Sequence, residues 1–303
     1  SDPMALIRER AATRGDVALA IGDDAALLRV PVGHEVVVTA DTLNEGVHFP
    51  GGTAPADIGW KALAANLSDL ASMGARPAWC TLSLSLPRAD PAWLEAFLDG
   101  FLELAAAHGI ALVGGDTTRG PLSIAVTAMG LVESGAALRR DRARVGDDVW
   151  VTGTLGDAAA ALVLGGHLPA PGDGVPAVPP PVAAWLEGRL ARPLPRVQAG
   201  RALLGLAHAC VDVSDGLLAD LGHICERSAV GAEVAIASLP CSAALRAAFG
   251  AECAVLQAGG GDDYELCFPA PRALREAGAL ALEQGGTEAT RIGRVVVGNR
   301  VCA

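Results

Sequence analysis

The stretch "CVDVSDGLLADL", residues 210–221, places carboxylates where the hydrophobic pattern would bury them. The apolar run from Cys210 to Val213 is typical of a buried strand, yet Asp212 lies inside it and Asp215 follows where a helix should begin. Burying a carboxylate is costly unless a partner or a metal ion compensates its charge. The stretch therefore predicts a strand, a turn and a helix that hold a pair of acids for a partner or a metal.

Strand and helix patterns alternate on both sides of this stretch. Apolar, β-branched runs indicate strands, and a 3.6-residue periodicity indicates helices. We expect strands at 36–41, 78–86, 110–113, 123–132, 148–152, 210–213, 264–268 and 291–297, and helices at 57–73, 91–108, from about 157, at 196–207 and at 216–228. Such alternation predicts an α/β or α+β fold built in layers.

The chain is long enough for two domains of ordinary size. The charged stretch "RRDRARVGDD", residues 139–148, precedes a new cycle of strand and helix, so we expect domains at 4–140 and 146–303. The stretch "LPAPGDGVPAVPPP", residues 168–181, is rich in Pro and Gly and predicts a surface loop or linker.

Composition narrows the classes of function. The 303 residues are 51% hydrophobic and carry a net charge of −11, which argues against nucleic acid as a partner, and no apolar run approaches the length of a membrane span. Lys61 is the sole lysine and follows Gly59 and Trp60, so the chain has no phosphate-binding loop of the Gly-Lys-Ser/Thr type. Seven scattered cysteines without a Cys-x-x-Cys pair predict reduced thiols in a cytoplasmic protein.

Further acids lie beside glycines at the ends of predicted strands. Asp24, Asp41, Asp116 and Asp262 occur in this setting, and Asp69 stands among small residues on the face of helix 57–73 opposite its apolar stripe. Carboxylate oxygens suit Mg²⁺, which bridges to substrate phosphates, and glycines let the backbone approach those phosphates. The repeated pattern favours a magnesium and phosphate site; a capping or solvent-facing role is the alternative for Asp69.

Seven motifs in order, from about residue 15 to residue 294, resemble the thiamine-monophosphate kinase family. They are the "IGDDAALL" start, "TADTLNEGVHF", "KALAANLSDLASMGARPAW", "LVGGDTTRGPLSIAVTAMG", "VTGTLGDAAAAL", "VDVSDGLLADLGHI" and "GGDDYELCF". The resemblance implies phosphoryl transfer from ATP to thiamine monophosphate. It also implies the two-domain fold of aminoimidazole ribonucleotide synthetase, in which the N-terminal domain pairs with its twin across a homodimer.

Carried over motif by motif, the resemblance assigns roles to twelve residues and no general base. Several Mg²⁺ ions would be held by Asp24, Thr39, Asp41, Asp69, Asp116, Asp212 and Asp215; ATP by Gly115, Asp116, Arg140 and Ser214; and thiamine monophosphate by His48 and Asp262. Three features depart from the family. Ala40 stands where a Thr is usual, Asp262 replaces a Glu, and the sequence ends at Ala303, before the aromatic tail that helps to enclose the thiamine rings.

Other interpretations stay open at this level. Another ATP-dependent enzyme of the same superfamily, or a non-catalytic module that binds nucleotide or metal, would share the acidic motifs. Without the resemblance, His48 is an ordinary loop histidine and Arg140 belongs to a solvated stretch. The stretch "TGTLGD", residues 152–157, is either a plain turn from strand to helix or a phosphate-binding turn.

Overall fold

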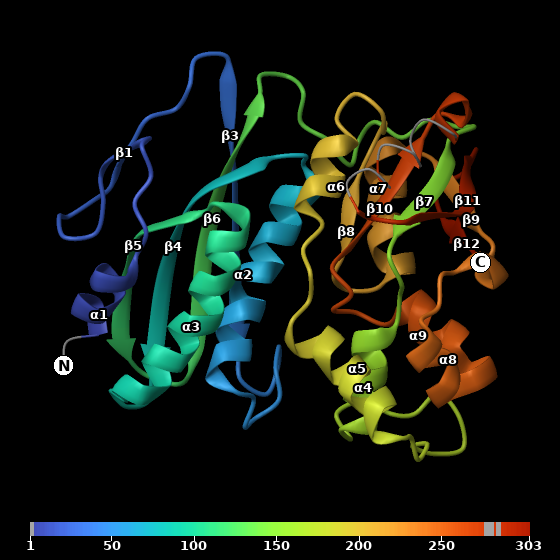
Figure 1. The fold of residues 1–303 in the computed structure, drawn as a ribbon. Coiled ribbons are helices and arrows are strands. Elements are labelled where there is room, and N and C mark those ends of the chain that lie inside the picture. The colour runs from blue at the N-terminus through green and yellow to red at the C-terminus, as the bar shows by residue number, and fades with distance from the viewer. Residues whose placement is uncertain (1–2, 276–281, 283–285) are drawn as a thin grey trace. The chain divides into compact units, whose positions relative to one another are not determined.

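The computed structural model describes residues 3–275, 282 and 286–303. Its chain divides into two compact units, one formed by Ser1–Leu70 and Ala75–Gly135 and the other by Ala71–Gly74 and Ala136–Ala303 (Figure 1). Each unit has its own mixed sheet and helices, and each is described here by itself.

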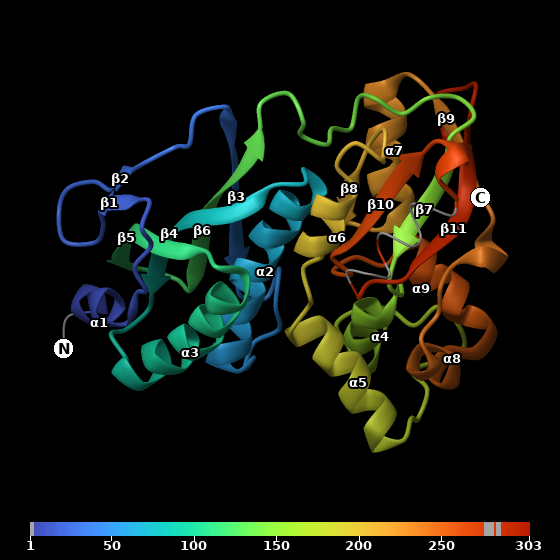
Figure 2. The ribbon, with the colours of Figure 1, turned by 45° about the horizontal axis from the view of Figure 1, so that its top comes forward.

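The first unit is built on a four-stranded sheet in the order β3-β6-β4-β5. β3 and β6 pair in antiparallel fashion, β6 and β4 likewise, and β4 and β5 run parallel. The elements are α1 (Pro3–Arg10), β1 (Val17–Leu19), β2 (Leu27–Leu28), β3 (His34–Asn44), α2 (Pro55–Ser72), β4 (Arg76–Leu86), α3 (Pro91–His108), β5 (Ala111–Arg119) and β6 (Ser123–Glu133). The long helices α2 and α3 cover one face of this sheet (Figures 1 and 2).

Helix α3 begins and ends where its local sequence predicts. The Asp90 carboxylate accepts a hydrogen bond from the N–H of Trp93, and Pro91 follows at the first helical position. Gly109 ends the helix with a left-handed φ of 64° and donates its N–H back to the last turn. Both boundaries match the predicted 91–108.

Helix α2 is buried on both sides, as the small residues opposite its apolar stripe suggested. Leu63 and Leu67 on one side and Ala62 and Asn66 on the other are all fully buried. The small side chains admit close neighbours, which leaves Asp69 partly exposed among them.

The second unit contains a six-stranded sheet in the order β12-β9-β11-β7-β10-β8. Its strands are β7 (Asp148–Thr152), β8 (Val211–Val213), β9 (Gly231–Val234), β10 (Glu265–Ala270), β11 (Ala289–Val296) and β12 (Val301–Cys302). Its helices are α4 (Asp157–Leu164), α5 (Pro180–Ala191), α6 (Val197–Ala202), α7 (Leu217–Ser228), α8 (Ala243–Phe249) and α9 (Cys253–Gly259), with short 3₁₀ turns at Ile236–Ser238, Gly250–Glu252 and Arg272–Leu274.

Two predicted segments differ in extent from the structure. The predicted loop 168–181 ends two residues early, because Pro180 and Pro181 form the first turn of α5, where prolines are tolerated. The predicted helix 196–207 is shorter, since α6 stops at Ala202 and irregular turns follow. Among the described helices, none combines the length and apolar character needed to cross a membrane. All seven cysteines are free thiols.

Candidate functional site

The stretch at 210–221 forms the predicted strand, turn and helix. Asp212 occupies the middle of β8, whose three residues are all buried, and it is only 3% exposed. Its strand pairs with β10, where Leu266 stands opposite Asp212. Asp215 lies in the following turn and is exposed. Asp212 thus lies in the buried strand that precedes the turn, and Asp215 lies three residues later in the exposed part of the turn.

Asp220 shapes this turn, and no role was predicted for it. Its carboxylate accepts hydrogen bonds from the N–H groups of Ser214, Asp215 and Gly216, at 2.9, 3.0 and 3.1 Å. Burial raises the pKa of Asp220, while these three N–H donors oppose that shift. The signal was present in the sequence as an acid in the first turn of an apolar helix, where it can reach back to the free N–H groups.

Asp215 has two other side chains near it that carry atoms able to bind a metal ion. Ligand atoms of Asp215, Asp220 and His223 all lie within 4.8 Å of one another. Since Asp220 already accepts three backbone hydrogen bonds, Asp215 is the member of this group best placed to bind an ion.

Asp262 lies beside the same turn. Its N–H donates to the carbonyl oxygen of Ser214 at 2.8 Å, and the N–H of Tyr264 donates to that of Val213 at 2.8 Å. The Tyr264 hydroxyl reaches a carboxylate oxygen of Asp262 at 3.3 Å. The structure therefore brings together two residues predicted to bind different ligands, Ser214 for ATP and Asp262 for thiamine monophosphate.

In the first unit, the structure joins Thr39 of β3 to Asp69 of α2. The Thr39 hydroxyl donates to the Asp69 carboxylate at 2.5 Å. Asp41 lies two residues further along β3, so its side chain points to the same side of the sheet as Thr39. These three oxygen-bearing side chains share the face that α2 covers. Ala40 points to the other face, is exposed, and offers no side-chain oxygen.

Gly115 and Asp116 lie on the opposite edge strand, β5. One row of the sheet runs from Asp41 through Val126 and Leu82 to Gly115, which is three strand spacings or about 14 Å. A side chain at Gly115 would meet the carbonyl oxygen of Leu82 at 1.8 Å, and its φ is +148°, so only glycine fits there.

Asp116 points away from the helix-covered face. It pairs with Ser83, whereas the flanking Leu82 and Leu84 of β4 are buried under the helices. Asp116 and Ser83 are both exposed on the other face, which we call the open face. Within one subunit, Asp116 thus lies on the opposite edge strand from Thr39 and Asp41, and its side chain is on the opposite face of the sheet from theirs and from Asp69.

Asp24 lies in the exposed loop between β1 and β2. Its N–H is held by the Asp23 carboxylate at 2.8 Å. Ala26 and Leu28, just beyond it, pack with Trp79 and Leu131 in a small apolar cluster.

His48 lies in the turn after β3 and is exposed. Its Nδ1 accepts the N–H of Asn44 at 3.0 Å, so the neutral ring carries its proton on Nε2. The Lys61 ammonium donates to the carbonyl oxygen of His48 at 3.0 Å. The ring is therefore oriented by its neighbours and presents an N–H donor outward.

The remaining predicted positions lie in the second unit. Arg140 is exposed, and its carbonyl oxygen accepts the hydroxyl of Ser228 at 2.7 Å. The turn "TGTLGD" does not have a free N–H for a phosphate at Gly156, because that N–H is bonded to the buried Asp263 carboxylate at 3.0 Å. This bond favours the interpretation of the turn as a plain strand-to-helix connection.

The donor set fits a hard divalent cation. The predicted ligands are carboxylates and one hydroxyl, the oxygen donors that Mg²⁺ prefers, and Thr39 and Asp69 already converge. The residues at hand would therefore suit magnesium and the phosphate groups that it bridges.

Comparisons with known proteins identify the family of the chain. Residues 22–132 match the N-terminal domain model, and residues 144–302 the C-terminal domain model, of AIR synthase related proteins. The chain is 46% identical over 284 residues to thiamine-monophosphate kinase of Escherichia coli, an alignment that covers 93% of this chain and 86% of the relative.

Solved structures are similar over nearly the full length. The crystal structure of thiamine-monophosphate kinase from Stenotrophomonas maltophilia is 55% identical, with a TM-score of 0.89, and the match covers 99% of this chain and 93% of that one. The structure of AaThiL complexed with AMPPCP and TMP is 33% identical, with a TM-score of 0.79, over 93% and 87% of the two chains. The chain belongs to the thiamine-monophosphate kinase family.

Proposed function

We propose that the protein transfers the γ-phosphoryl group of ATP to thiamine monophosphate in the cytoplasm, forming thiamine diphosphate and ADP. The observation that carries this proposal is the similarity, over 93% of the chain, to a structure complexed with AMPPCP, a nonhydrolysable analogue of ATP, and TMP. The family motifs support the same reaction. So do the oxygen ligands at Thr39 and Asp69 and the close backbone packing at Gly115, where only glycine fits.

The reaction needs no general base. The phosphate of thiamine monophosphate is already an anion of about −1.5 to −2 near neutral pH. One of its oxygens attacks the γ-phosphorus in line, an O–P bond forms, the bond from the γ-phosphorus to the β-γ bridging oxygen breaks, and ADP leaves with that electron pair. The obstacle is repulsion between two anionic groups, and bound Mg²⁺ would neutralise part of that charge.

The residues of this chain then bind and orient the two anions. We assign Asp24, Thr39, Asp41, Asp69, Asp116, Asp212 and Asp215 to the Mg²⁺ ions, Gly115, Asp116, Arg140 and Ser214 to ATP, and His48 and Asp262 to thiamine monophosphate. The outward Nε2–H of His48 suits a phosphate oxygen. We propose residues 4–140 and 146–303 as the two functional domains.

We also propose that the protein acts as a homodimer joined through the open face. That face exposes Val36 at 38% and Val38 at 61%, beside Ala40 and Thr42, a small and apolar row that a second copy could cover. Asp116 lies on this face, away from the Thr39 and Asp69 pair of its own subunit.

The activity is tested by ADP release with and without thiamine monophosphate. We expect release to depend on the acceptor, and Asp69→Asn to reduce turnover by about a hundredfold or more at low Mg²⁺, because a ligand carboxylate is lost. Circular dichroism should be unchanged, since the amide fills the same volume.

The matched control is Asp99→Asn, which changes an exposed acid on α3 that pairs with Arg10. It should keep full activity. ADP release that is indifferent to thiamine monophosphate would rule out this substrate, and near-normal turnover of Asp69→Asn at low Mg²⁺ would rule out its role as a ligand.

A further inference from the structure

The turn that carries Asp262 has an unfavourable backbone. Asp262 and Tyr264 adopt left-handed φ values of 64° and 51°, which residues with side chains rarely take. Such a conformation persists only when its surroundings hold it. The two backbone hydrogen bonds to Val213 and Ser214 hold one side of the turn. The other side is held by side chains.

Asp263, between these two residues, is the buried anchor. It is 3% exposed, and both of its carboxylate oxygens lie 3.0 Å from the N–H of Gly156. Gly156 is itself confined, because its φ is +88° and a side chain there would meet the backbone of Leu256 and Gln257 at 2.9 Å. The anchor point is therefore a rigid part of the fold.

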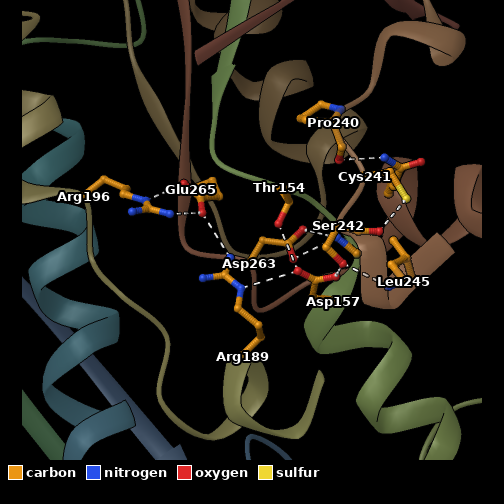
Figure 3. Close-up of polar contacts among 12 residues, drawn as sticks. Thr154, Asp157, Arg189, Arg196, Pro240, Cys241, Ser242, Leu245, Asp263 and Glu265 are labelled. Carbon is orange, nitrogen blue, oxygen red and sulfur yellow. Dashed lines mark hydrogen bonds and ion pairs between the residues drawn. The ribbon is translucent and has the colours of Figure 1, made fainter. Parts of the chain in front are cut away.

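Glu265, two residues on, is tied in by a second set of contacts (Figure 3). Arg196 donates two hydrogen bonds to its carboxylate, each at 2.7 Å, and Arg189 a third at 3.1 Å. The Thr152 hydroxyl donates to the same carboxylate at 2.6 Å. Glu265 is fully buried, so this cluster fixes the start of β10 directly after the turn.

The carboxylates of this cluster are buried, so they stabilise the fold and do not bind a substrate. Asp157 completes it, held by Ser242 at 2.5 Å and Thr154 at 2.9 Å, so three buried carboxylates face two guanidinium groups. Burial raises the pKa of Asp263 well above its ordinary range, and the Gly156 N–H opposes that shift. An acid in this setting serves as a fixed hydrogen-bond acceptor inside the protein.

We propose that Asp263 is a positioning residue for thiamine monophosphate: by accepting the N–H of Gly156, it holds the strained turn in the conformation that presents Asp262 to the substrate. The inference rests on the proposed function, which assigns Asp262 to that substrate. Asp263 does not touch the substrate; it acts through its neighbour in the chain.

A double-mutant cycle tests this role. We expect Asp263→Ala to raise the KM for thiamine monophosphate about tenfold, because one well-placed contact to the substrate is lost. The KM for ATP should stay at the wild-type value. Added to Asp262→Ala, it should have no further effect on the KM, because its effect passes through Asp262. Asp263→Asn keeps an oxygen for the Gly156 N–H and should restore the wild-type KM.

Amide hydrogen exchange provides a readout that does not need turnover. Residues 261–264 should exchange faster in Asp263→Ala, while Asp173→Ala, which changes an exposed acid of the same unit, should leave both exchange and KM unchanged. Should Asp263→Ala fail to fold, Asp263→Ser, whose hydroxyl is too short to reach the Gly156 N–H, takes its place.

Additive effects of the two substitutions on KM, or unchanged exchange at 261–264, would overturn the positioning role. A wild-type protein that does not phosphorylate thiamine monophosphate would instead overturn the proposed function, and the exchange result would still decide whether Asp263 holds the turn.

Discussion

At the residue scale, neighbouring acids in one turn perform different tasks. Asp215 is exposed and is proposed to bind Mg²⁺, whereas Asp220 is buried and bonded to three backbone N–H groups. The difference follows from what each carboxylate faces. A buried acceptor of three N–H groups stabilises the turn, and an exposed carboxylate with free oxygens suits a cation.

We therefore predict opposite outcomes for the two positions. Asp220→Ala should lower the free energy of unfolding by about 2 kcal/mol, because three N–H groups lose their acceptor. Asp215→Asn should leave stability unchanged and weaken Mg²⁺ binding. Urea unfolding and calorimetric titration with Mg²⁺ measure the two quantities. Equal stability of Asp220→Ala and the wild type would show that water replaces the carboxylate at no cost.

At the scale of elements, Asp148 ties β7 to its surroundings. It is the first residue of β7 and is 1% exposed. Arg275, after the third 3₁₀ turn, bonds it at 2.7 and 3.0 Å, and Arg291 of β11 lies 3.4 Å away. Hydrogen bonding from Arg275 is the main cause that lowers the pKa of Asp148 below its ordinary value of 3.8, and burial opposes the shift.

A lowered pKa makes this contribution depend on pH in a known direction. The stabilisation is present above the unfolded value near 3.8 and is lost as pH falls through the folded pKa. Asp148→Asn should cost about 1–2 kcal/mol at pH 7, since both arginines are half exposed, and the difference from the wild type should shrink below pH 4. Urea unfolding at pH 7, 5, 4 and 3 measures it, with Asp173→Asn as control. A difference that persists unchanged at pH 3 would indicate altered packing instead of lost charge.

At the scale of the whole molecule, the predicted metal ligands of the first unit lie on both faces of its sheet. The Thr39 and Asp69 pair and Asp116 lie on opposite faces of one sheet and about 14 Å apart across its strands. A second copy on the open face would contact Asp116 and leave the Thr39 and Asp69 pair on the far side of the sheet. The proposed dimer thus covers the exposed Val36 and Val38 and does not by itself bring the acids of the two faces together.

The features that could be predicted from the sequence are local ones. The bounds of α3 follow from Asp90 and Gly109, and the strand, turn and helix at 210–221 follow from hydrophobic periodicity, because caps and periodicity depend on residues close in the chain. The acid motifs likewise predicted the family. Only the folded chain shows which acids are buried anchors, as with Asp263 and Glu265, and which face of the sheet Asp116 occupies. Those outcomes depend on contacts with residues 69 to 113 positions away and on strand register, which no local pattern encodes.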